Sequence, residues 1–412
     1  MTARNHINRR RRLGSALLIA AAALTAVPAV AIADHSVPEG LGFYTAPEDR
    51  IPGPHGSLIW TRTLTGDPGL PGARNQLVLY RSVDVQGRPI AVSGTVAVPA
   101  TSPPEDGWPL ISWAHGTTGV ADMCAPSRDT GPDYPAHDYT ALVREVQARW
   151  IAAGYAVAQT DYQGLGTPGP HGYLIGAAEQ RAVTDIALAA RELDPSIGTR
   201  WVAVGHSQGG QAAIFTAAQA QQWAPRLQLL GSVALAPASH TALVVELARI
   251  STAAGVASAA ATFTDNATAF LPLLIRGAQT VAEIDPARFL TPRALGLLPT
   301  ADNGCIGQLR SPDEWGGLPA GTVFTATGDT GPFSRVLYDN DPGHLRFGPP
   351  LLVLQGGGDT TVPPAATDAM VAEMRLTAQP VDYRTYPGVD HRAVLDASYR
   401  DVFTWTNARF GR

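Results

Sequence analysis

The alternation of apolar and polar positions along the chain predicts short strands that alternate with helices. Runs rich in branched apolar residues indicate strands, and apolar residues that recur every three or four positions indicate helices. By this pattern we expect strands at residues 76–83, 89–98, 109–114, 155–161, 200–205, 228–236, 350–355 and 381–386. We expect helices at residues 139–153, 178–193, 209–223, 365–376 and 393–409. Such alternation is typical of the α/β fold class, in which helices flank both faces of a mostly parallel sheet.

Two stretches depart from this alternation. Residues 34–75 are rich in proline and glycine, which predicts irregular structure. Residues 237–345 begin with an alanine-rich stretch, have helical periodicity broken by prolines and contain no predicted core strand, so we expect a helical insertion there. The chain thus divides into a first core segment at 34–236, the insertion at 237–345 and a second core segment at 346–412.

The amino terminus has the three-part pattern of a secretory signal peptide. Four arginines, Arg9–Arg12, precede the apolar run Leu13–Val30, and the small-x-small segment Ala31–Ala33 follows. We therefore expect residues 1–33 to be removed, leaving a secreted chain that begins at Asp34. An uncleaved membrane anchor is the competing interpretation, and consecutive arginines also permit twin-arginine export. No other stretch approaches the roughly 20 apolar residues that span a bilayer, which predicts no stable membrane insertion after cleavage.

Composition excludes several classes of function. Hydrophobic residues make up 45% of the 412 residues, which excludes disorder throughout the chain. The formal net charge is −5, and all 30 basic residues are arginine. The first 33 residues hold five arginines and no acid, so the remainder carries 25 basic against 35 acidic residues, or −10. An acidic chain without a basic stripe is not expected to bind nucleic acid. The oligomeric state is left open.

The segment Gly205-His206-Ser207-Gln208-Gly209 has the G-x-S-x-G pattern, and it lies where a predicted strand meets a predicted helix. A serine hydroxyl is a weak nucleophile and must be held next to a base. In this motif the glycines let strand and helix pass closely, and the N–H after the serine points at the developing oxyanion. The context therefore predicts that Ser207 is a nucleophile. A glycine-rich turn with an incidental serine is the alternative.

Two later residues complete the chain order serine, aspartate, histidine that such a nucleophile requires. Asp359 follows the predicted strand at 350–355, at the sheet edge where parallel strands end. His391 lies after the last predicted strand and is the only histidine beyond Asp359. We predict that His391 acts as the base and that Asp359 fixes its tautomer. Three other aspartates are alternatives that follow no predicted core strand: Asp302, Asp329 and Asp368.

The oxyanion of an acyl-transfer reaction needs a second N–H donor. The turn Trp113–Gly119 follows the strand at 109–114, where the G-x-S-x-G architecture places that donor. We assign the backbone N–H groups of Thr117 and Gln208 to an oxyanion hole, with Thr118 as an alternative to Thr117. Each donor is worth about 3 kcal/mol in the transition state. Because no HExxH or paired CxxC pattern occurs, we expect no cofactor and no catalytic metal.

The chain has two cysteines, Cys124 and Cys305. An exported protein meets an oxidising compartment, which favours one disulfide over two separate buried thiols. Such a bridge would close a loop of about 180 residues and contribute several kcal/mol in the chain-entropy model.

These motifs together resemble the secretory lipase family of α/β-hydrolases. The resemblance extends from about residue 40 onward and rests on these segments: Gly205–Gly210, His115-Gly116, Cys124–Ser127, Asp161–Gly164, Asp359 and His391. It implies hydrolysis of carboxylic esters or triacylglycerols and a helical cap inserted between the sixth and seventh strands. It also implies that Cys124 and Cys305 tie the oxyanion region to the cap. Some family members place an acidic side chain at the oxyanion site, where this sequence has threonines.

The leading hypothesis is a secreted serine hydrolase that cleaves acylglycerols or similar apolar esters through an acyl-enzyme on Ser207. An extracellular acyltransferase that uses the same three residues is the alternative. A peptidase of the same fold is disfavoured because neither a propeller nor a charged pocket is visible. A non-catalytic binding protein is disfavoured because a fold alone does not require the three residues.

Overall fold

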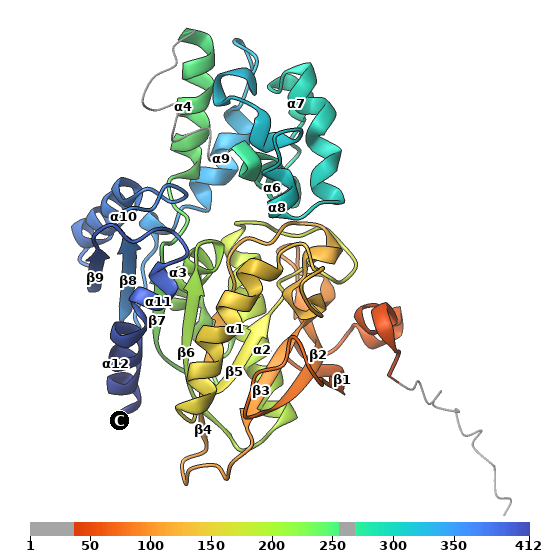
Figure 1. The fold of residues 1–412 in the computed structure, drawn as a ribbon, viewed down its shortest axis with the longest axis vertical. Coiled ribbons are helices and arrows are strands. Elements are labelled where there is room, and N and C mark those ends of the chain that lie inside the picture. Colours follow the sequence, from red (N-terminus) through yellow and green to blue (C-terminus); the bar gives the residue numbers. More distant parts are fainter. Residues whose placement is uncertain (1–36, 255–267) are drawn as a thin grey trace, which may run out of the picture. The chain divides into compact units, whose positions relative to one another are not determined.

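The computed structural model describes residues 37–254 and 268–412, and a nine-stranded sheet forms its centre (Figure 1). The strands lie side by side in the order β1-β2-β3-β5-β4-β6-β7-β8-β9. They are β1 (Leu58–Thr63), β2 (Ala73–Val83), β3 (Pro89–Pro99), β4 (Trp108–Ala114), β5 (Ala156–Thr160), β6 (Ile197–His206), β7 (Gln228–Leu235), β8 (Leu351–Gly356) and β9 (Val381–Tyr386). Pairing is antiparallel from β1 to β5 and parallel from β5 to β9. The predicted α/β class with a mostly parallel sheet is confirmed.

Helices cover both faces of this sheet. Outside the insertion they are α1 (His137–Ala152), α2 (Gly176–Leu193), α3 (Gln208–Trp223), α10 (Pro364–Leu376), α11 (Val394–Ala397) and α12 (Tyr399–Phe410). Leu110 of β4 packs in one cluster with side chains of α2 and α3. Its neighbour Ile111 packs in another cluster with side chains of α1 and α12. Successive residues of a strand point to opposite faces, so β4 is buried on both sides, as its unbroken apolar sequence predicts.

The prediction of irregular structure over residues 34–75 is wrong in part. Strand β1 pairs antiparallel with β2, whose first residues also fall in this range. Trp60 of β1 is buried, while the flanking prolines and glycines give the segment the composition of a loop. Long-range pairing supplies the order here, and local composition does not show it. Because β1 adds one strand to the count, the helical insertion lies between the seventh and eighth strands rather than between the sixth and seventh.

The helical insertion has its own apolar core. Its α-helices are α4 (Thr241–Ala254), α6 (Leu271–Gln279), α7 (Pro292–Leu297), α8 (Ile306–Leu309) and α9 (Gly331–Asp339), and they lie above the carboxyl ends of the strands in Figure 1. Phe289, Trp315 and Phe333 are among its buried residues. Short 3-10 helices occur at Gly40–Tyr44 (η1), Glu48–Arg50 (η2), Asp122–Cys124 (η3), Pro126–Arg128 (η4), Thr268–Phe270 (η5), Pro286–Arg288 (η6), Leu298–Asp302 (η7), Trp315–Gly317 (η8), Ala320–Thr322 (η9) and Pro342–His344 (η10). The insertion therefore forms a helical cap over the sheet edge.

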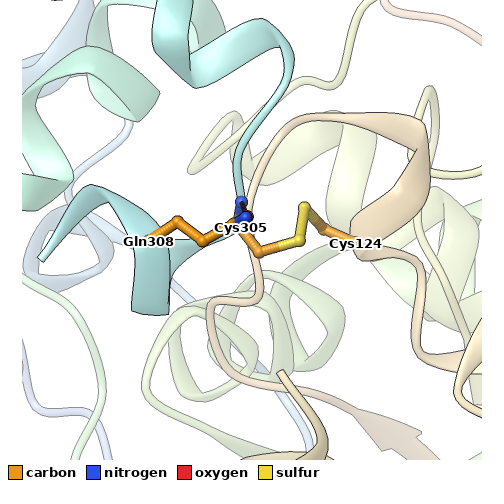
Figure 2. Close-up of a disulfide and its surroundings, with 3 residues drawn as sticks. All are labelled: Cys124, Cys305 and Gln308. Atoms are coloured by element: carbon orange, nitrogen blue, oxygen red, sulfur yellow. Dashed lines mark hydrogen bonds between the residues drawn. A yellow bond between two sulfur atoms is a disulfide. The ribbon is translucent and has the colours of Figure 1, made fainter. Parts of the chain in front are cut away.

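A disulfide joins Cys124 to Cys305, as predicted (Figure 2). Cys124 lies shortly after β4, and Cys305 directly precedes α8. An isolated β-bridge pairs Gly119 with Cys305, and the Ile306 N–H donates to the carbonyl oxygen of Thr118 at 2.8 Å. The cap is thus held to the turn that follows β4 by one covalent bond and by backbone hydrogen bonding.

The predicted signal peptide at residues 1–33 lies outside the described residues, as does the predicted new amino terminus at Asp34. Within the part of the chain that the structure describes, no helix is both long enough and apolar enough to cross a membrane.

Candidate active site

Ser207 lies on the sharp turn between β6 and α3. Its φ is 60° and its ψ is −115°, a conformation that residues with a side chain rarely adopt. The Ser207 N–H donates to the Leu235 carbonyl at 2.8 Å, and the Ser207 carbonyl accepts from the Gly210 N–H at 2.9 Å. These backbone bonds hold the strained residue in place, so its hydroxyl is presented at the end of the strand.

The glycines of the G-x-S-x-G motif are required by close backbone contact. A Cβ added at Gly205 would lie 1.9 Å from the carbonyl oxygen of Gly209. A Cβ added at Gly209 would lie 1.9 Å from the carbonyl oxygen of Ala114 on the neighbouring strand. Since real Cβ atoms do not approach backbone this closely, β4, β6 and α3 can meet here only with glycine at both positions.

The structure brings the three predicted triad residues together. The His391 Nε2 lies 3.0 Å from the Ser207 Oγ, and the His391 Nδ1 lies 2.7 Å from the Asp359 Oδ2. Asp359 is buried, and its Oδ1 accepts the N–H groups of Thr361 and Val362 at 2.8 and 2.9 Å. A carboxylate fixed in this way accepts the Nδ1–H of His391, which leaves the Nε2 lone pair free to accept the serine proton.

The three alternative aspartates have other partners. Asp302 pairs with Arg276 at 2.6 Å, and Asp329 pairs with Arg288 at 3.0 Å. Asp368 accepts a hydrogen bond from the Tyr383 hydroxyl at 2.6 Å. Among the described aspartates, only Asp359 is hydrogen-bonded to His391.

The backbone N–H groups predicted to form the oxyanion hole are free to donate to a substrate. The backbone N–H groups of Thr117 and Gln208 donate to no group among the described residues. Thr117 and Ser207 line the same cavity, whereas Thr118 is fully buried and does not line it. The Thr117 Oγ1 is fixed at 2.8 Å from the Tyr173 hydroxyl. This geometry favours Thr117 over Thr118 as the second donor.

A buried polar network that the sequence analysis missed holds the Gln208 side chain. The Gln208 Nε2 donates to the Glu179 Oε1 at 2.7 Å and lies 3.1 Å from the His171 Nε2. The His171 Nδ1–H donates to the Gln163 carbonyl at 2.7 Å, so its Nε2 is the acceptor for Gln208. Glu179 is 1% exposed, and burial raises its pKa to about 8. The sequence does contain a signal of this network, because Glu179 places a carboxyl group on the apolar face of the predicted helix at 178–193.

A second chain of hydrogen bonds, also missed, links the turn after β4 to His391. The Tyr139 hydroxyl accepts the Gly116 N–H at 2.6 Å and lies 3.0 Å from the His206 Nδ1. The His206 Nε2 in turn lies 2.8 Å from the backbone carbonyl of His391 and donates to it. Burial, and after it the charge of His391, lowers the pKa of His206 well below its ordinary value. Neutral His206 therefore acts as a spacer that positions the loop carrying His391.

Two cavities meet at Ser207. The larger, of about 860 Å³ and open to solvent, lies between the cap and the sheet edge. Its lining is mainly apolar and includes Leu174, Val245, Phe270, Leu271, Leu274, Val323 and Val362. The smaller, of about 310 Å³, is lined by His391, Thr117 and Tyr139 together with two arginines, Arg310 and Arg392. The nucleophile is therefore bordered by an apolar side and a cationic side.

One group of side chains within the described residues could in principle bind a metal ion. Ligand atoms of His240, Asp341 and Glu373 all lie within 4.8 Å of one another. Both carboxylate oxygens of Asp341 already accept backbone N–H groups, from His240 and from Gly343. The His240 Nε2 lies 3.2 Å from the Glu373 Oε1. The existing hydrogen bonds and ion pair explain this cluster as a structural contact where the cap joins the core.

Fold and residue arrangement together define an α/β-hydrolase fold that carries a hydrogen-bonded Ser-His-Asp set at the strand ends. The predicted resemblance to the secretory lipase family is confirmed, because the sequence model of that family, described as "Secretory lipase", matches residues 142–284. The model of the prolyl oligopeptidase family matches residues 334–412, the segment that holds Asp359 and His391.

The chain is also similar to curated relatives in sequence and to solved structures in fold. A lipase A from Moesziomyces aphidis is 28% identical over 54% of this chain and 49% of its own length. A probable inactive lipase from Mycobacterium tuberculosis is 28% identical over 39% of this chain and 36% of its own. The chain thus spans half or less of the length of these curated relatives. Candida antarctica lipase A superposes with a TM-score of 0.67 at 18% identity, covering 85% of this chain and 80% of that one. The rice cell wall degrading esterase LipA from Xanthomonas oryzae superposes with a TM-score of 0.65 at 17% identity, covering 86% of this chain and 98% of that one.

Proposed function

We propose that this chain is a secreted serine hydrolase that cleaves acylglycerols or similar apolar carboxylic esters through an acyl-enzyme on Ser207. One observation carries the proposal. Ser207, His391 and Asp359 form an unbroken chain of hydrogen bonds, and it begins at a serine held in a strained turn. A protein that only binds ligands has no need of that strain or of that chain.

The geometry supports a two-step mechanism. The His391 Nε2 takes the Ser207 hydroxyl proton while the Oγ attacks the ester carbonyl carbon. The carbonyl oxygen becomes an oxyanion and accepts the N–H groups of Thr117 and Gln208. Collapse of this intermediate breaks the bond to the alcohol oxygen, which His391 protonates. Water, deprotonated by His391, then attacks the acyl-enzyme, and the acid leaves as Ser207 regains its proton. Asp359 stabilises the imidazolium in both steps.

The cavities and the chain's export pattern support the substrate class and the location. The apolar lining of the larger cavity beside Ser207 fits the acyl chain of an ester better than it fits a charged or sugar group. The signal-peptide pattern at residues 1–33 and the disulfide between Cys124 and Cys305 both favour an oxidising compartment outside the cell.

Acyl transfer is the second candidate, because an acceptor alcohol could attack the same acyl-enzyme in place of water. Product analysis separates the two. With hexanol present, a hydrolase gives mainly free acid, and a transferase gives mainly the hexyl ester.

The test is a panel of p-nitrophenyl esters of short to long chain, assayed with the wild type, with Ser207→Ala and with Ser239→Ala. Ser239 is a buried serine that lines the larger cavity but has no contact with His391 among the described residues, so it is the matched control. We expect turnover by the wild type and by Ser239→Ala, and loss by several powers of ten in Ser207→Ala. Turnover that survives in a folded Ser207→Ala protein would contradict the proposal.

A further inference from the structure

Of the two cavities that meet at Ser207, only the smaller one is lined by His391. In ester cleavage the histidine that accepted the serine proton must pass it to the departing alcohol oxygen. The alcohol part of the substrate therefore leaves on the side of His391. This assigns the smaller cavity to the alcohol and the larger apolar cavity to the acyl chain.

The smaller cavity is lined by two arginines, and the nearby carboxylate of Asp138 acts on both, which leaves one positive charge in excess. Arg392 is paired with Asp138 at 2.6 Å and lies over the ring of Tyr139. The guanidinium of Arg310 lies over the ring of Phe270, 5.1 Å from its centroid, and makes no ion pair or hydrogen bond with the described residues. Burial, and after it the charge of Arg392, lowers the pKa of Arg310, yet an arginine stays protonated.

The disulfide between Cys124 and Cys305 anchors the start of the segment that carries Arg310 (Figure 2). Arg310 directly follows the single-turn helix α8, whose first residue follows Cys305. The N–H of Cys305 donates to the Gln308 side-chain oxygen at 2.8 Å, which closes this turn on itself. The Ile306 N–H donates to the Thr118 carbonyl, next to the proposed oxyanion donor. The backbone that carries Arg310 is thus anchored next to the site.

We propose that Arg310 makes this site select esters whose alcohol part carries an anionic group, a phosphate or a carboxylate. The proposal rests on the proposed ester hydrolysis. A guanidinium presents parallel N–H donors that match either anion in a bidentate arrangement. The apolar acyl cavity and the cationic alcohol cavity together describe an amphipathic, anionic ester.

The test compares two substrates that differ only in the phosphate group, 1-octanoylglycerol 3-phosphate and 1-octanoylglycerol. The octanoyl ester of glyceric acid, measured against its own methyl ester, distinguishes a carboxylate from a phosphate. Released octanoate is quantified by mass spectrometry, and the readout is the ratio of kcat/KM for the charged ester to that for the neutral one. Each ratio is measured for the wild type, Arg310→Gln and Arg293→Gln. Arg293 is an exposed arginine of the same cap with no ion pair to the described residues.

We expect a ratio on the order of 10 for the wild type with at least one anion, as one charge-assisted hydrogen-bonded pair provides. Arg310→Gln should bring that ratio to about one, and Arg293→Gln should retain it, since only the charge in the cavity recognises the anion. A wild type that cleaves the neutral esters with no preference for either anion would overturn the proposal and leave the proposed hydrolysis standing. An anion preference that persists in Arg310→Gln would also overturn it. A wild type that cleaves no ester would overturn both.

Discussion

Replacing Glu179 with glutamine should change the way the stability of this protein depends on pH. Glu179 is 1% exposed, and its Oε1 accepts hydrogen bonds from the Gln208 side chain and from the Leu174 N–H. Its Oε2 has no partner among the described residues. Burial, the largest influence, raises its pKa from the ordinary 4.5 to about 8. At neutral pH the folded protein therefore keeps this carboxyl group protonated, whereas the unfolded chain has released the proton.

The size of the effect follows from these two pKa values. Between pH 4.5 and pH 8 the folded state binds one more proton at Glu179 than the unfolded state does, so rising pH favours unfolding. Stability from this group is complete below pH 4.5 and is lost as the pH rises toward 8. Integrating from pH 6.5 to pH 8 gives a loss of about 1.6 kcal/mol in the free energy of unfolding. Glutamine has nearly the same shape and does not titrate, so the variant lacks this loss.

The assay is urea unfolding of the wild type and of Glu179→Gln at pH 6.5, 7.0, 7.5 and 8.0. Other titrating groups, such as His171, are present in both proteins and cancel in the difference. The free energy of unfolding of the variant minus that of the wild type should rise by about 1.6 kcal/mol across this range. A difference that stays constant with pH would refute the reasoning, because it would mean that Glu179 is already ionised in the folded protein.

Two further predictions follow from the same contacts. Asp359→Asn should lower kcat/KM by about 10⁴-fold without unfolding the protein, because the amide cannot fix the His391 tautomer. The control Asp368→Asn should keep a kcat/KM near that of the wild type. Circular dichroism and ester kinetics check both variants, and an active Asp359→Asn would mean that another residue is the acid of the triad. Replacing both Cys124 and Cys305 by serine should lower the free energy of unfolding by about 5 kcal/mol in the chain-entropy model, because the bridge closes a loop with a sequence separation of 181. Urea unfolding with and without reductant checks this prediction, and a double variant as stable as the oxidised wild type would contradict it.

The positions of the candidate site residues that follow strands could be predicted from the sequence. Ser207 and Asp359 come after the buried apolar strands β6 and β8, and His391 comes after β9, in which polar and larger side chains alternate. Parallel strands end at the same edge of the sheet. Their mutual contact therefore follows from topology. The Thr117 turn follows β4 in the same way, and its closeness to Ser207 follows from the pairing of β4 with β6.

The supporting contacts could not be predicted in this way. Glu179 reaches Gln208, and Tyr139 reaches His206, from helices whose rotation about their axes depends on packing over the whole sheet. Strand β1 depends equally on its long-range partner β2. In each case a contact between residues far apart in the sequence determines the local structure, and hydrophobic periodicity within a short window does not reveal such a contact.

The central claim, that Ser207 is an activated nucleophile, is tested most directly by labelling with a fluorophosphonate followed by peptide mapping. We predict one label per chain, on the peptide that carries Ser207, and no label in His391→Ala, since the hydroxyl is then no longer deprotonated. Ser239→Ala, which alters a serine of the same cavity, should be labelled like the wild type. Labelling at another serine, or no labelling of the folded wild type, would contradict the account.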